Sequence, residues 1–318
     1  MTQVYPNVSL VRRDNRRDNV YGALDLVRDD VVQKLRPQVM LKPNFLSGDN
    51  QLASSHVDVA RGTIDFLMST PNPPEEILIA EGGNEKYSGQ AFDNFGYRAL
   101  LDEYDVPIKL IDLNQETKWE EETIYLVDGS PYTVHMPKTV LDCPCTISMA
   151  IAKTHDTCVV TLALKNMIMG TIQKIDRVKM HGFASHHDRK VPDESKVMHI
   201  NLIRLARHLA PDISVIDGTV GLQGNGPGGT DAIDLGVATA GVDVFAVDAV
   251  MTSVMGFDPL KIGLSVYGNQ LGMGIADLEK VNILGTTVES VRQSFKPHET
   301  TELQLQWQHD QATELMAV

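Results

Sequence analysis

The sequence has 318 residues, of which 42% are hydrophobic and 6% aromatic, and its formal net charge is −14. This length is enough for one large α/β domain or for two smaller ones. The strongly negative charge argues against nucleic acid and against an anionic membrane surface as the main partner, because both would repel the chain.

The first third of the chain alternates between predicted strands and predicted helices. Short apolar runs indicate the strands, and apolar residues at helical spacing indicate the helices between them. A regular alternation of this kind predicts an α/β fold, with a mostly parallel sheet covered by helices on both faces. In chain order, the predicted elements are the strand 8–11, the helix 19–35, the strand 38–41, the helix 57–68, the strand 77–80, the helix 90–104 and the strand 108–113.

Polar side chains directly follow two of these strands. Lys42 and Asn44 flank Pro43 after the second strand, and Glu81 follows the third. Proline cannot donate to a sheet ladder, so the second strand should end there. Ligands of open α/β sheets gather at the carboxyl ends of parallel strands. Lys42, Asn44 and Glu81 are therefore candidates for binding a substrate, with residues of an exposed loop as the alternative.

The segment 115–137 interrupts the alternation. Two alternating runs, 123–127 and 132–136, surround Asp128-Gly129, and Asp-Gly between two strand-like runs is a strong hairpin signal. We expect an antiparallel hairpin insertion here. It is a candidate lid, or a candidate contact for assembly into a homo-oligomer.

The core resumes after the hairpin with a predicted strand over 145–152. We therefore predict a single α/β domain over 1–295, with two lobes joined near 140–150 as the alternative. The tail over 296–318 is rich in Gln, Glu and His, and we expect it to fray.

The chain has three cysteines, Cys143, Cys145 and Cys158. This low and odd number, with no apolar segment at the start of the chain, indicates a reducing compartment, so we expect a cytoplasmic protein. No apolar run reaches the about 18 residues of a membrane-spanning helix, so no membrane partner is expected. The number and spacing of the cysteines fit neither a standard iron–sulfur cluster nor a zinc site, and we expect structural cysteines.

The segment 151–170 carries two lysines, a histidine, an asparagine and several threonines in an otherwise apolar run. Lys153 and His155 leave the predicted strand, and a short helical stretch then brings Lys165 and Asn166. Buried polar groups cost free energy unless they find partners, so a ligand, a metal or an internal network is expected here. For Lys165 and Asn166 there is an alternative, in which they compensate the dipole and cap the last turn of a helix. That alternative does not explain Lys153 and His155.

The stretch from 150 to 210 is locally basic and rich in histidine. It holds ten basic and five acidic residues, and six of the ten histidines of the chain. This composition indicates a region that handles an anion or a metal, with a random fluctuation on solvated faces as the alternative. The part from 171 to 197 is predicted to be a loop, and loops of this length are usually functional or disordered.

A divalent transition metal is a candidate cofactor, because a histidine-rich loop that faces a carboxylate can bind such an ion. The histidines lack the short regular spacings of helical or strand-borne metal sites. Acid–base, anion-contacting or plain loop histidines are the alternative. The candidate ligands are His155, His181, His186, His187 and Asp217.

A glycine-rich segment, 221–229, follows the predicted strand 213–216, which ends at Asp217. Five glycines among its nine residues permit close backbone approach to a ligand, and successive N–H groups can bind an anion. The spacing matches neither a dinucleotide-binding loop nor a Walker loop, so a flexible surface loop is the alternative. The candidate substrate-binding residues of this loop are Gly224, Asn225 and Gly226. The other predicted elements are the helix 199–209, the strand 235–240, the helices 244–255 and 258–271, and the strand 281–284.

Several short motifs now stand in one order along roughly 38–285. They are Lys42-Pro43-Asn44, Lys153-Thr154-His155, Thr161 with Leu164-Lys165-Asn166 and Gly170, His181, Asp217-Gly218, Gly224-Asn225-Gly226-Pro227, Asp243 with Asp248, and Gly256. In this combination the chain resembles the family known as domain of unknown function 362. The resemblance implies an α/β fold. Many longer members carry a ferredoxin-like cysteine motif, which is absent here, so the resemblance implies no iron–sulfur cluster for this chain.

The sequence favours an enzyme that acts on a small anionic molecule, either a carboxylate or a phosphate. Lys153, Lys165 and the glycine loop would hold the anion, and His155 or His181 would act as general acid or base, since histidine titrates near neutral pH. Asp217 would orient a histidine or hold a metal. The alternatives are a metalloenzyme, a non-catalytic protein that binds an anionic small molecule or cofactor, and a scaffold. The candidate catalytic residues are His155, Lys153, His181 and Asp217, and the candidate substrate-binding residues are Lys42, Asn44, Glu81, Lys165, Asn166 and the three of the glycine loop.

Overall fold

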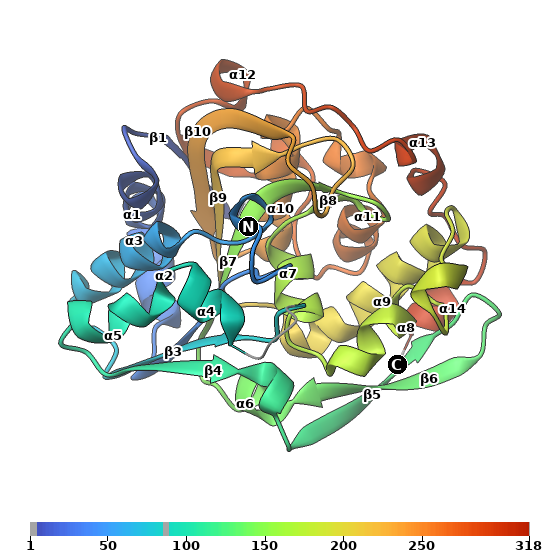
Figure 1. The fold of residues 1–318 in the computed structure, drawn as a ribbon. Helices are drawn as coiled ribbons and strands as arrows, with labels where there is room; N and C mark the ends of the chain where they lie inside the picture. Colours follow the sequence, from blue (N-terminus) through green and yellow to red (C-terminus); the bar gives the residue numbers. More distant parts are fainter. Residues whose placement is uncertain (1–4, 85–88, 318) are drawn as a thin grey trace.

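A mixed β-sheet lies at the centre of the computed structural model, which describes residues 5–84 and 89–317. A separate pair of strands, β5 and β6, extends from one side (Figure 1). In these ranges the strands are β1 (Asn7–Arg12), β2 (Gln38–Lys42), β3 (Glu76–Glu81), β4 (Ile108–Asp112), β5 (Trp119–Tyr125), β6 (Pro131–Pro137), β7 (Thr146–His155), β8 (Val159–Thr161), β9 (Ile213–Leu222), β10 (Ala232–Gly241) and β11 (Asn282–Gly285).

The strands of the central sheet follow the order β11-β1-β10-β9-β7-β2-β3-β4, and β8 pairs with β7 beside this path. Parallel pairing joins β9, β7, β2, β3 and β4 in turn, and also joins β1 to β11. Strand β10 runs antiparallel to both of its neighbours, and β8 runs antiparallel to β7. The predicted mostly parallel sheet and the predicted antiparallel hairpin are therefore both confirmed.

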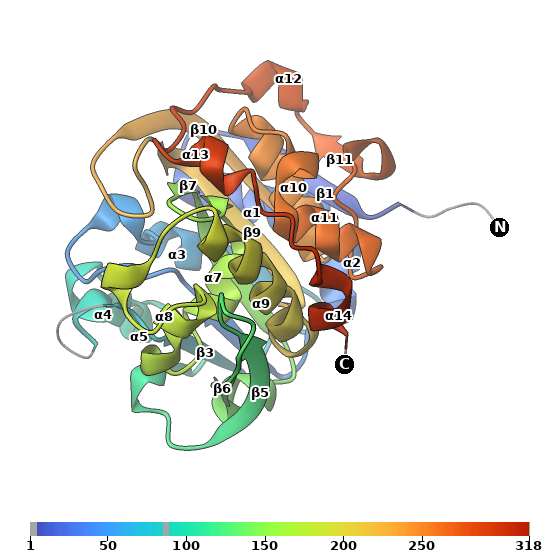
Figure 2. The same ribbon diagram turned by 90° about the vertical axis from the view of Figure 1, so that its right-hand side faces the viewer.

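Helices cover both faces of the sheet, as Figures 1 and 2 show from two sides. This arrangement confirms the predicted α/β fold class. In the described ranges the α-helices are α1 (Arg16–Leu26), α2 (Arg28–Lys34), α3 (Val57–Met68), α4 (Gln90–Asn94), α5 (Leu100–Glu103), α6 (Lys138–Leu141), α7 (Ala163–Met169), α8 (Arg177–Met180), α9 (Asp193–Leu209), α10 (Val244–Val254), α11 (Gly263–Gln270), α12 (Val288–Val291), α13 (Thr301–Gln304) and α14 (Ala312–Met316).

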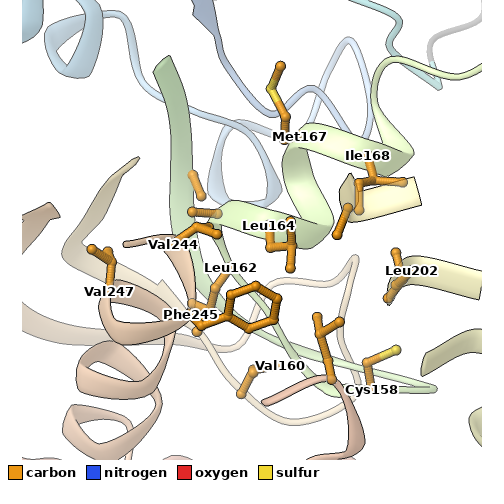
Figure 3. Packing of buried hydrophobic residues seen from close by; sticks show 14 of the residues in the cluster. Cys158, Val160, Leu162, Leu164, Met167, Ile168, Leu202, Val244, Phe245 and Val247 are labelled. Carbon is orange, nitrogen blue, oxygen red and sulfur yellow. The ribbon is translucent and has the colours of Figure 1, made fainter. Parts of the chain in front are cut away.

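The strands supply side chains to two hydrophobic layers, one on each face. Val39 and Leu41 of β2 belong to the layer with α1 and α3, whereas Met40 between them belongs to the layer with α7, α9 and α10. This alternation follows from the two-residue period of a strand. Figure 3 shows the second layer, in which Leu164 of α7 and Phe245 of α10 are both buried. Each such side chain contributes about 1.5–3 kcal/mol when fully buried.

The β5–β6 hairpin packs on α9. Asn201 of α9 forms two hydrogen bonds with the backbone of Tyr125 in β5, each of 2.9 Å. Arg204, one turn further along α9, donates to the carbonyl of Thr123 over 2.5 Å. These bonds fix the hairpin to the body of the protein, and its role as a lid or an oligomer contact stays a prediction.

The C-terminal tail packs along α9 and α11 instead of fraying (Figure 2). The Trp307 ring lies edge-on against Tyr267 of α11, and its Nε1 donates to the carbonyl of Lys261 over 2.7 Å. Gln304 and Met316 are also buried. The expectation of fraying rested on the polar composition of the tail, and a few well-placed buried side chains outweigh that composition.

Other local predictions were wrong. The predicted helix 90–104 is interrupted, because α4 ends at Asn94 and a 3₁₀ turn at 97–99 precedes α5, and the predicted helix 258–271 consists of a 3₁₀ turn at 259–261 followed by α11. The predicted helix 19–35 is divided into α1 and α2 at Val27, where the backbone leaves the helical conformation. The predicted loop 171–197 contains short helical turns, namely the 3₁₀ helices Lys174–Asp176 and His186–Asp188 together with α8, and α9 begins at Asp193 rather than at residue 199. Short turns of this kind lack the long apolar period that reveals a helix.

Candidate functional site

A cavity of about 340 Å³ lies at the carboxyl ends of β2 and β7. Its walls come from the ends of these strands, from β8, α7 and α8, and from the 3₁₀ turn at 186–188. Most of the lining is polar, and cationic side chains predominate. The polar lining residues are Asn44, Asn84, Lys153, His155, Asp156, Thr161, Lys165, Lys174, Arg177, His181, His186 and Arg189.

Lys153 lies near the end of β7, and its side chain lines the cavity. Its Nζ donates to Asn44 Oδ1 over 2.7 Å and to the carbonyl of Ala53 over 3.0 Å. The side chain is only 1% exposed. Burial and the nearby Lys165 ammonium both disfavour the charged form, and together they lower the pKa of Lys153 to about 7. Lys153 can therefore gain or lose a proton close to neutral pH.

Lys165, His155 and Asp156 form a contiguous chain of polar contacts. The Nζ of Lys165 lies 3.0 Å from His155 Nε2, and His155 Nδ1 lies 3.0 Å from Asp156 Oδ1. The backbone N–H of Thr157 also points at Nδ1, over 2.9 Å. Burial and Lys165 lower the pKa of His155 to about 3, so its ring is neutral at neutral pH.

A neutral imidazole has one ring proton, so these contacts allow two arrangements. With the proton on Nδ1, the ring donates to Asp156 and Nε2 accepts from the Lys165 ammonium. With the proton on Nε2, the ring donates to a neutral Lys165 amine and Nδ1 accepts from the N–H of Thr157. Burial lowers the pKa of Lys165, which brings the neutral amine within reach. Passing from the first arrangement to the second removes one proton from the site.

His181 and Arg189 close the cavity on the side of α9. The His181 ring lies parallel to that of His155, with the ring centroids 6.2 Å apart. Burial lowers the pKa of His181 to about 4. Arg189 donates to Asp156 over 2.9 Å and to Glu194 over 2.8 Å. Burial alone would raise the pKa of Asp156, but the His155 ring and the Arg189 guanidinium hold it well below its ordinary value.

Arg177 of α8 supplies a guanidinium to the opposite side of the cavity. It donates to Asn84 Oδ1 over 3.0 Å, to Asn114 Oδ1 over 3.2 Å and to the carbonyl of Ile172. All of these acceptors are neutral amides. The positive charge of Arg177 is therefore fixed in position at the cavity without direct neutralisation by these contacts.

A second polar layer lies behind the cavity wall. Lys42 forms a buried ion pair with Glu81 and donates to Asn166 Oδ1 over 3.0 Å. Asn166 also accepts from Asn44, over 3.0 Å, and thereby connects this layer to the cavity. Burial lowers the pKa of Lys42 and raises that of Glu81, while their pairing opposes both shifts. A Cβ at Gly170 would lie 2.2 Å from Lys42 Nζ, so this position requires glycine for close packing.

The structure brings together many of the residues that the sequence singled out, in two layers. Asn44, Lys153, His155, Lys165, His181 and His186 line the cavity, and Lys42, Glu81 and Asn166 lie behind it. The alternative in which Lys165 and Asn166 cap the end of a helix is wrong. They are the third and fourth residues of α7, and Gly170 follows its last residue.

Asp217 lies elsewhere. It sits in the middle of β9 rather than at the end of the strand, and its carboxylate binds Arg16 over 2.7 Å. Gly218 continues the strand and does not mark a turn. A Cβ at this position would lie 3.0 Å from side-chain atoms of Val237 and Met251, so the glycine permits close packing against β10 and α10.

The glycine loop connects the antiparallel strands β9 and β10 and packs on the end of β7. Thr154 Oγ1 donates to the carbonyl of Gly224 over 2.9 Å, and Asn225 bonds to Glu299. A Cβ at Gly226 would lie 2.2 Å from the carbonyl oxygen of Thr154. The glycines therefore serve close backbone packing, and among the described residues of this loop the cavity is lined by Pro227.

The candidate metal ligands do not assemble into one group. His155, His181 and His186 line the cavity, but His187 lies outside its lining and Asp217 binds Arg16. Within residues 5–84 and 89–317, no three His, Cys, Asp or Glu side chains are arranged to hold a metal ion. The three cysteines are free thiols.

Several residues that line the cavity were not predicted from the sequence. They include Asn84, Asp156, Thr161, Arg177 and Arg189. Asp156 directly follows His155, and the local excess of positive charge included both arginines. These signals were present, but no local pattern shows which of the ten basic residues face the same cavity. A second cavity, of about 370 Å³, adjoins the C-terminal tail at 308–311 and has a mostly polar lining of exposed and partly buried side chains.

The comparisons with known proteins cover the part of the chain that forms the cavity. The family described as "Domain of unknown function (DUF362)" matches residues 39–253, a range that contains every lining residue. A curated relative, the thylakoid-associated protein sll1697 of Synechocystis sp., is 26% identical over 246 residues, which are 74% of this chain and 68% of that protein.

Among solved structures, the lactate racemase apoprotein of Thermoanaerobacterium thermosaccharolyticum matches with a TM-score of 0.46 and 12% identity. The match covers 76% of this chain and 54% of that chain, so this chain spans about half the length of the solved protein. In the described part of the chain, no helix has both the length and the apolar character needed to cross a bilayer.

Proposed function

The chain belongs to the DUF362 family, and we propose that it is an enzyme that binds a small carboxylate or phosphate in the cavity and moves protons at the bound molecule. The observation that carries this proposal is a pair of buried lysines, Lys153 and Lys165, at 1% and 5% exposure. In the described ranges, neither ammonium group lies within ion-pair distance of a carboxylate; their polar contacts are with neutral groups.

Lys42 provides a comparison within the same sheet edge. It is equally buried, but Glu81 balances its charge directly. A buried charge without a counter-charge costs several kcal/mol, so two such groups beside one cavity favour a ligand that brings negative charge with it. The fixed guanidinium of Arg177 adds a third cation to the same cavity.

The proposed proton chemistry uses groups that can change protonation state in the cavity. Burial keeps His155 and His181 neutral, with pKa values of about 3 and about 4, so near neutral pH they can accept a proton but do not supply one. Lys153, with a pKa of about 7, is the complementary group that can supply one. The sequence-based expectation that histidine titrates near neutral pH is therefore revised by the burial of both rings.

The proposal is tested by calorimetric titration with propionate and with inorganic phosphate, using wild-type protein, Lys153→Met and the control Lys34→Met. Lys34 is exposed and lies outside the cavity lining. We expect Lys153→Met to weaken anion binding by about tenfold or more, since a hydrogen bond to a charged group contributes about 1.5–3 kcal/mol. In the absence of anion, Lys153→Met should melt at a higher temperature than the wild type, because an unpaired buried cation is removed.

Proton transfer is tested by nuclear magnetic resonance in D₂O, with a panel of small carboxylates. Protein-dependent exchange of a carbon-bound hydrogen that is lost in His155→Ala would support the enzyme. Binding without exchange or turnover of any member would instead indicate a non-catalytic binding protein. If neither anion binds, and Lys153→Met melts like Lys34→Met, the proposed site is wrong altogether.

A further inference from the structure

We propose that Lys165 forms a covalent imine with a 2-oxo acid, through its Nζ and the carbonyl carbon of the substrate. The inference rests on the proposed function, because it names the class of anion and the reaction that the same cavity would carry out. It follows from three features of the cavity: an amine with one polar contact, a neighbouring cation, and a buried hydroxyl with no hydrogen-bond partner among the described residues.

The amine is positioned by α7. Lys165 is the third residue of this helix, and the backbone N–H groups of the two residues before it, Ala163 and Leu164, donate to the buried carboxylate of Asp248 over 2.8 and 3.2 Å. The start of α7 is therefore held firmly against α10. Lys165 lines the cavity, and among the described residues its Nζ has one hydrogen-bond contact, with His155 Nε2.

His155 provides the route by which Lys165 loses its proton. An ammonium proton of Lys165 passes to Nε2 as the proton on Nδ1 moves along the hydrogen bond to Asp156 and on to water; Asp156, whose side chain is about one-third exposed, is a carboxylate before and after the transfer. The imidazole is neutral before and after this transfer. A lysine whose charge is not paired, and which faces a proton acceptor, is suited to act as a nucleophile.

Lys153 and Thr161 suit the two oxygen-bearing groups of a 2-oxo acid. Lys153 pairs with Thr161 across β7 and β8, so both residues lie side by side in the cavity wall. The Lys153 ammonium offers a site for the carboxylate and disfavours a second positive charge on Lys165. The Thr161 hydroxyl is buried and lacks a hydrogen-bond partner among the described residues, so it is free to contact the former carbonyl oxygen.

The reaction is balanced without an oxidant or a further reactant. The lone pair of Lys165 Nζ attacks the carbonyl carbon, and the carbonyl oxygen takes up a proton as the carbinolamine forms. That oxygen then leaves as water with a second proton, and the nitrogen gives up its hydrogens to complete the C=N bond. The carboxylate of the 2-oxo acid keeps its charge and stays beside Lys153.

The experiment traps the imine in the full-length protein. Wild-type protein is incubated with pyruvate and sodium borohydride, digested, and mapped by mass spectrometry, with Lys165→Arg and the exposed-site control Lys34→Arg in parallel. Propionate serves as the matched carboxylate without a carbonyl. We expect a reduced pyruvate adduct on Lys165 that forms about tenfold or more faster than on Lys34, is absent with propionate, and persists in Lys34→Arg.

The outcomes separate this inference from the proposed function. If pyruvate and propionate bind by calorimetry but no adduct forms on Lys165, or if adducts spread evenly over the exposed lysines, the imine is refuted and the anion site stands. If neither compound binds, both proposals fail. Mapping in the wild-type protein does not depend on the folding of Lys165→Arg, so the test remains decisive if that variant is unstable.

Discussion

Gln304 of α13 connects the C-terminal tail to the strand end that carries His155. Its Nε2 donates to the carbonyl of His155 over 2.9 Å, and its Oε1 accepts from the N–H of Val159 over 2.6 Å. Val159 has a φ of 63°, a left-handed conformation that is unfavourable for a β-branched residue by about 1–2 kcal/mol. The buried amide of Gln304 thus holds in place the strained turn between His155, which lines the cavity, and Val159.

Replacing Gln304 with Leu is expected to remove both hydrogen bonds, because Leu is an apolar side chain of similar size to Gln. Each backbone group left buried without a partner costs about 1–3 kcal/mol, so the variant should lose about 2–6 kcal/mol of unfolding free energy. Movement of the turn would also separate His155 from Lys165, and binding of propionate should weaken. Urea unfolding measures the first effect, and calorimetry under conditions where the variant is folded measures the second.

Gln306→Leu is the matched control. Gln306 is exposed and lies two residues away, and its side chain donates to the carbonyl of Glu302. Surface substitutions of this kind usually change stability by no more than about 0.5 kcal/mol. If Gln304→Leu and Gln306→Leu unfold at the same urea concentration, the tail does not support the turn and this reasoning is refuted.

Three further outcomes are expected. Gly170→Ala should destabilise the protein by about 1–3 kcal/mol in urea unfolding, because its Cβ would overlap the buried Lys42 Nζ; wild-type stability would show that the Lys42 side chain can move aside. Burial and Lys165 lower the pKa of Lys153 to about 7, so propionate affinity should fall as pH rises from about 7 to about 9, and a flat calorimetric profile would contradict this assignment. Burial lowers the pKa of His199 to about 3, so the unfolded chain takes up the proton first as pH falls, and stability is lost below the unfolded pKa of about 6.5. Between about pH 7.5 and pH 5 the contribution of His199 to this loss is about 2 kcal/mol. The total loss of stability should be smaller by about this amount in His199→Leu than in the exposed-site control His187→Leu, and equal pH dependence of the two variants would rule it out.

The sequence predicted those parts of the fold in which the direction of buried side chains repeats every few residues along the chain. In β2, Val39 and Leu41 face one hydrophobic layer and Met40 the other, so the apolar run is a direct record of a strand buried on both faces. The polar residues that end such runs, Lys42 and Lys153 among them, must then lie at one edge of the sheet. Their convergence could be predicted because the topology of a parallel sheet requires it.

The failures concern residues whose surroundings are distant in sequence. Asp217 followed by Gly218 has the pattern of a strand end, but the glycine lies inside β9 and packs closely against side chains of β10 and α10, which no local pattern reveals. Arg189 contacts Asp156, which lies 33 residues earlier in the sequence, and Gln304 contacts His155, which lies 149 residues earlier. Gln304 also lies outside the range 39–253 that the family matches, so in this chain a segment beyond that range completes the support of the cavity.

The three buried lysines at this edge of the sheet differ in what surrounds the ammonium group, and that difference separates their roles. Lys42 faces Glu81, so its charge is balanced within the fold and its removal would leave a buried carboxylate unpaired. Lys153 is held by Asn44 and a backbone carbonyl, which orient the ammonium but leave its charge available to an anion. Lys165 faces a neutral imidazole that can take its proton. Replacement of Lys42 should therefore destabilise the protein with or without anion, whereas replacement of Lys153 or Lys165 by an apolar residue should weaken anion binding without destabilising the anion-free protein. A set of variants in which all three lysines had the same effect on stability and on anion binding would contradict this division of roles.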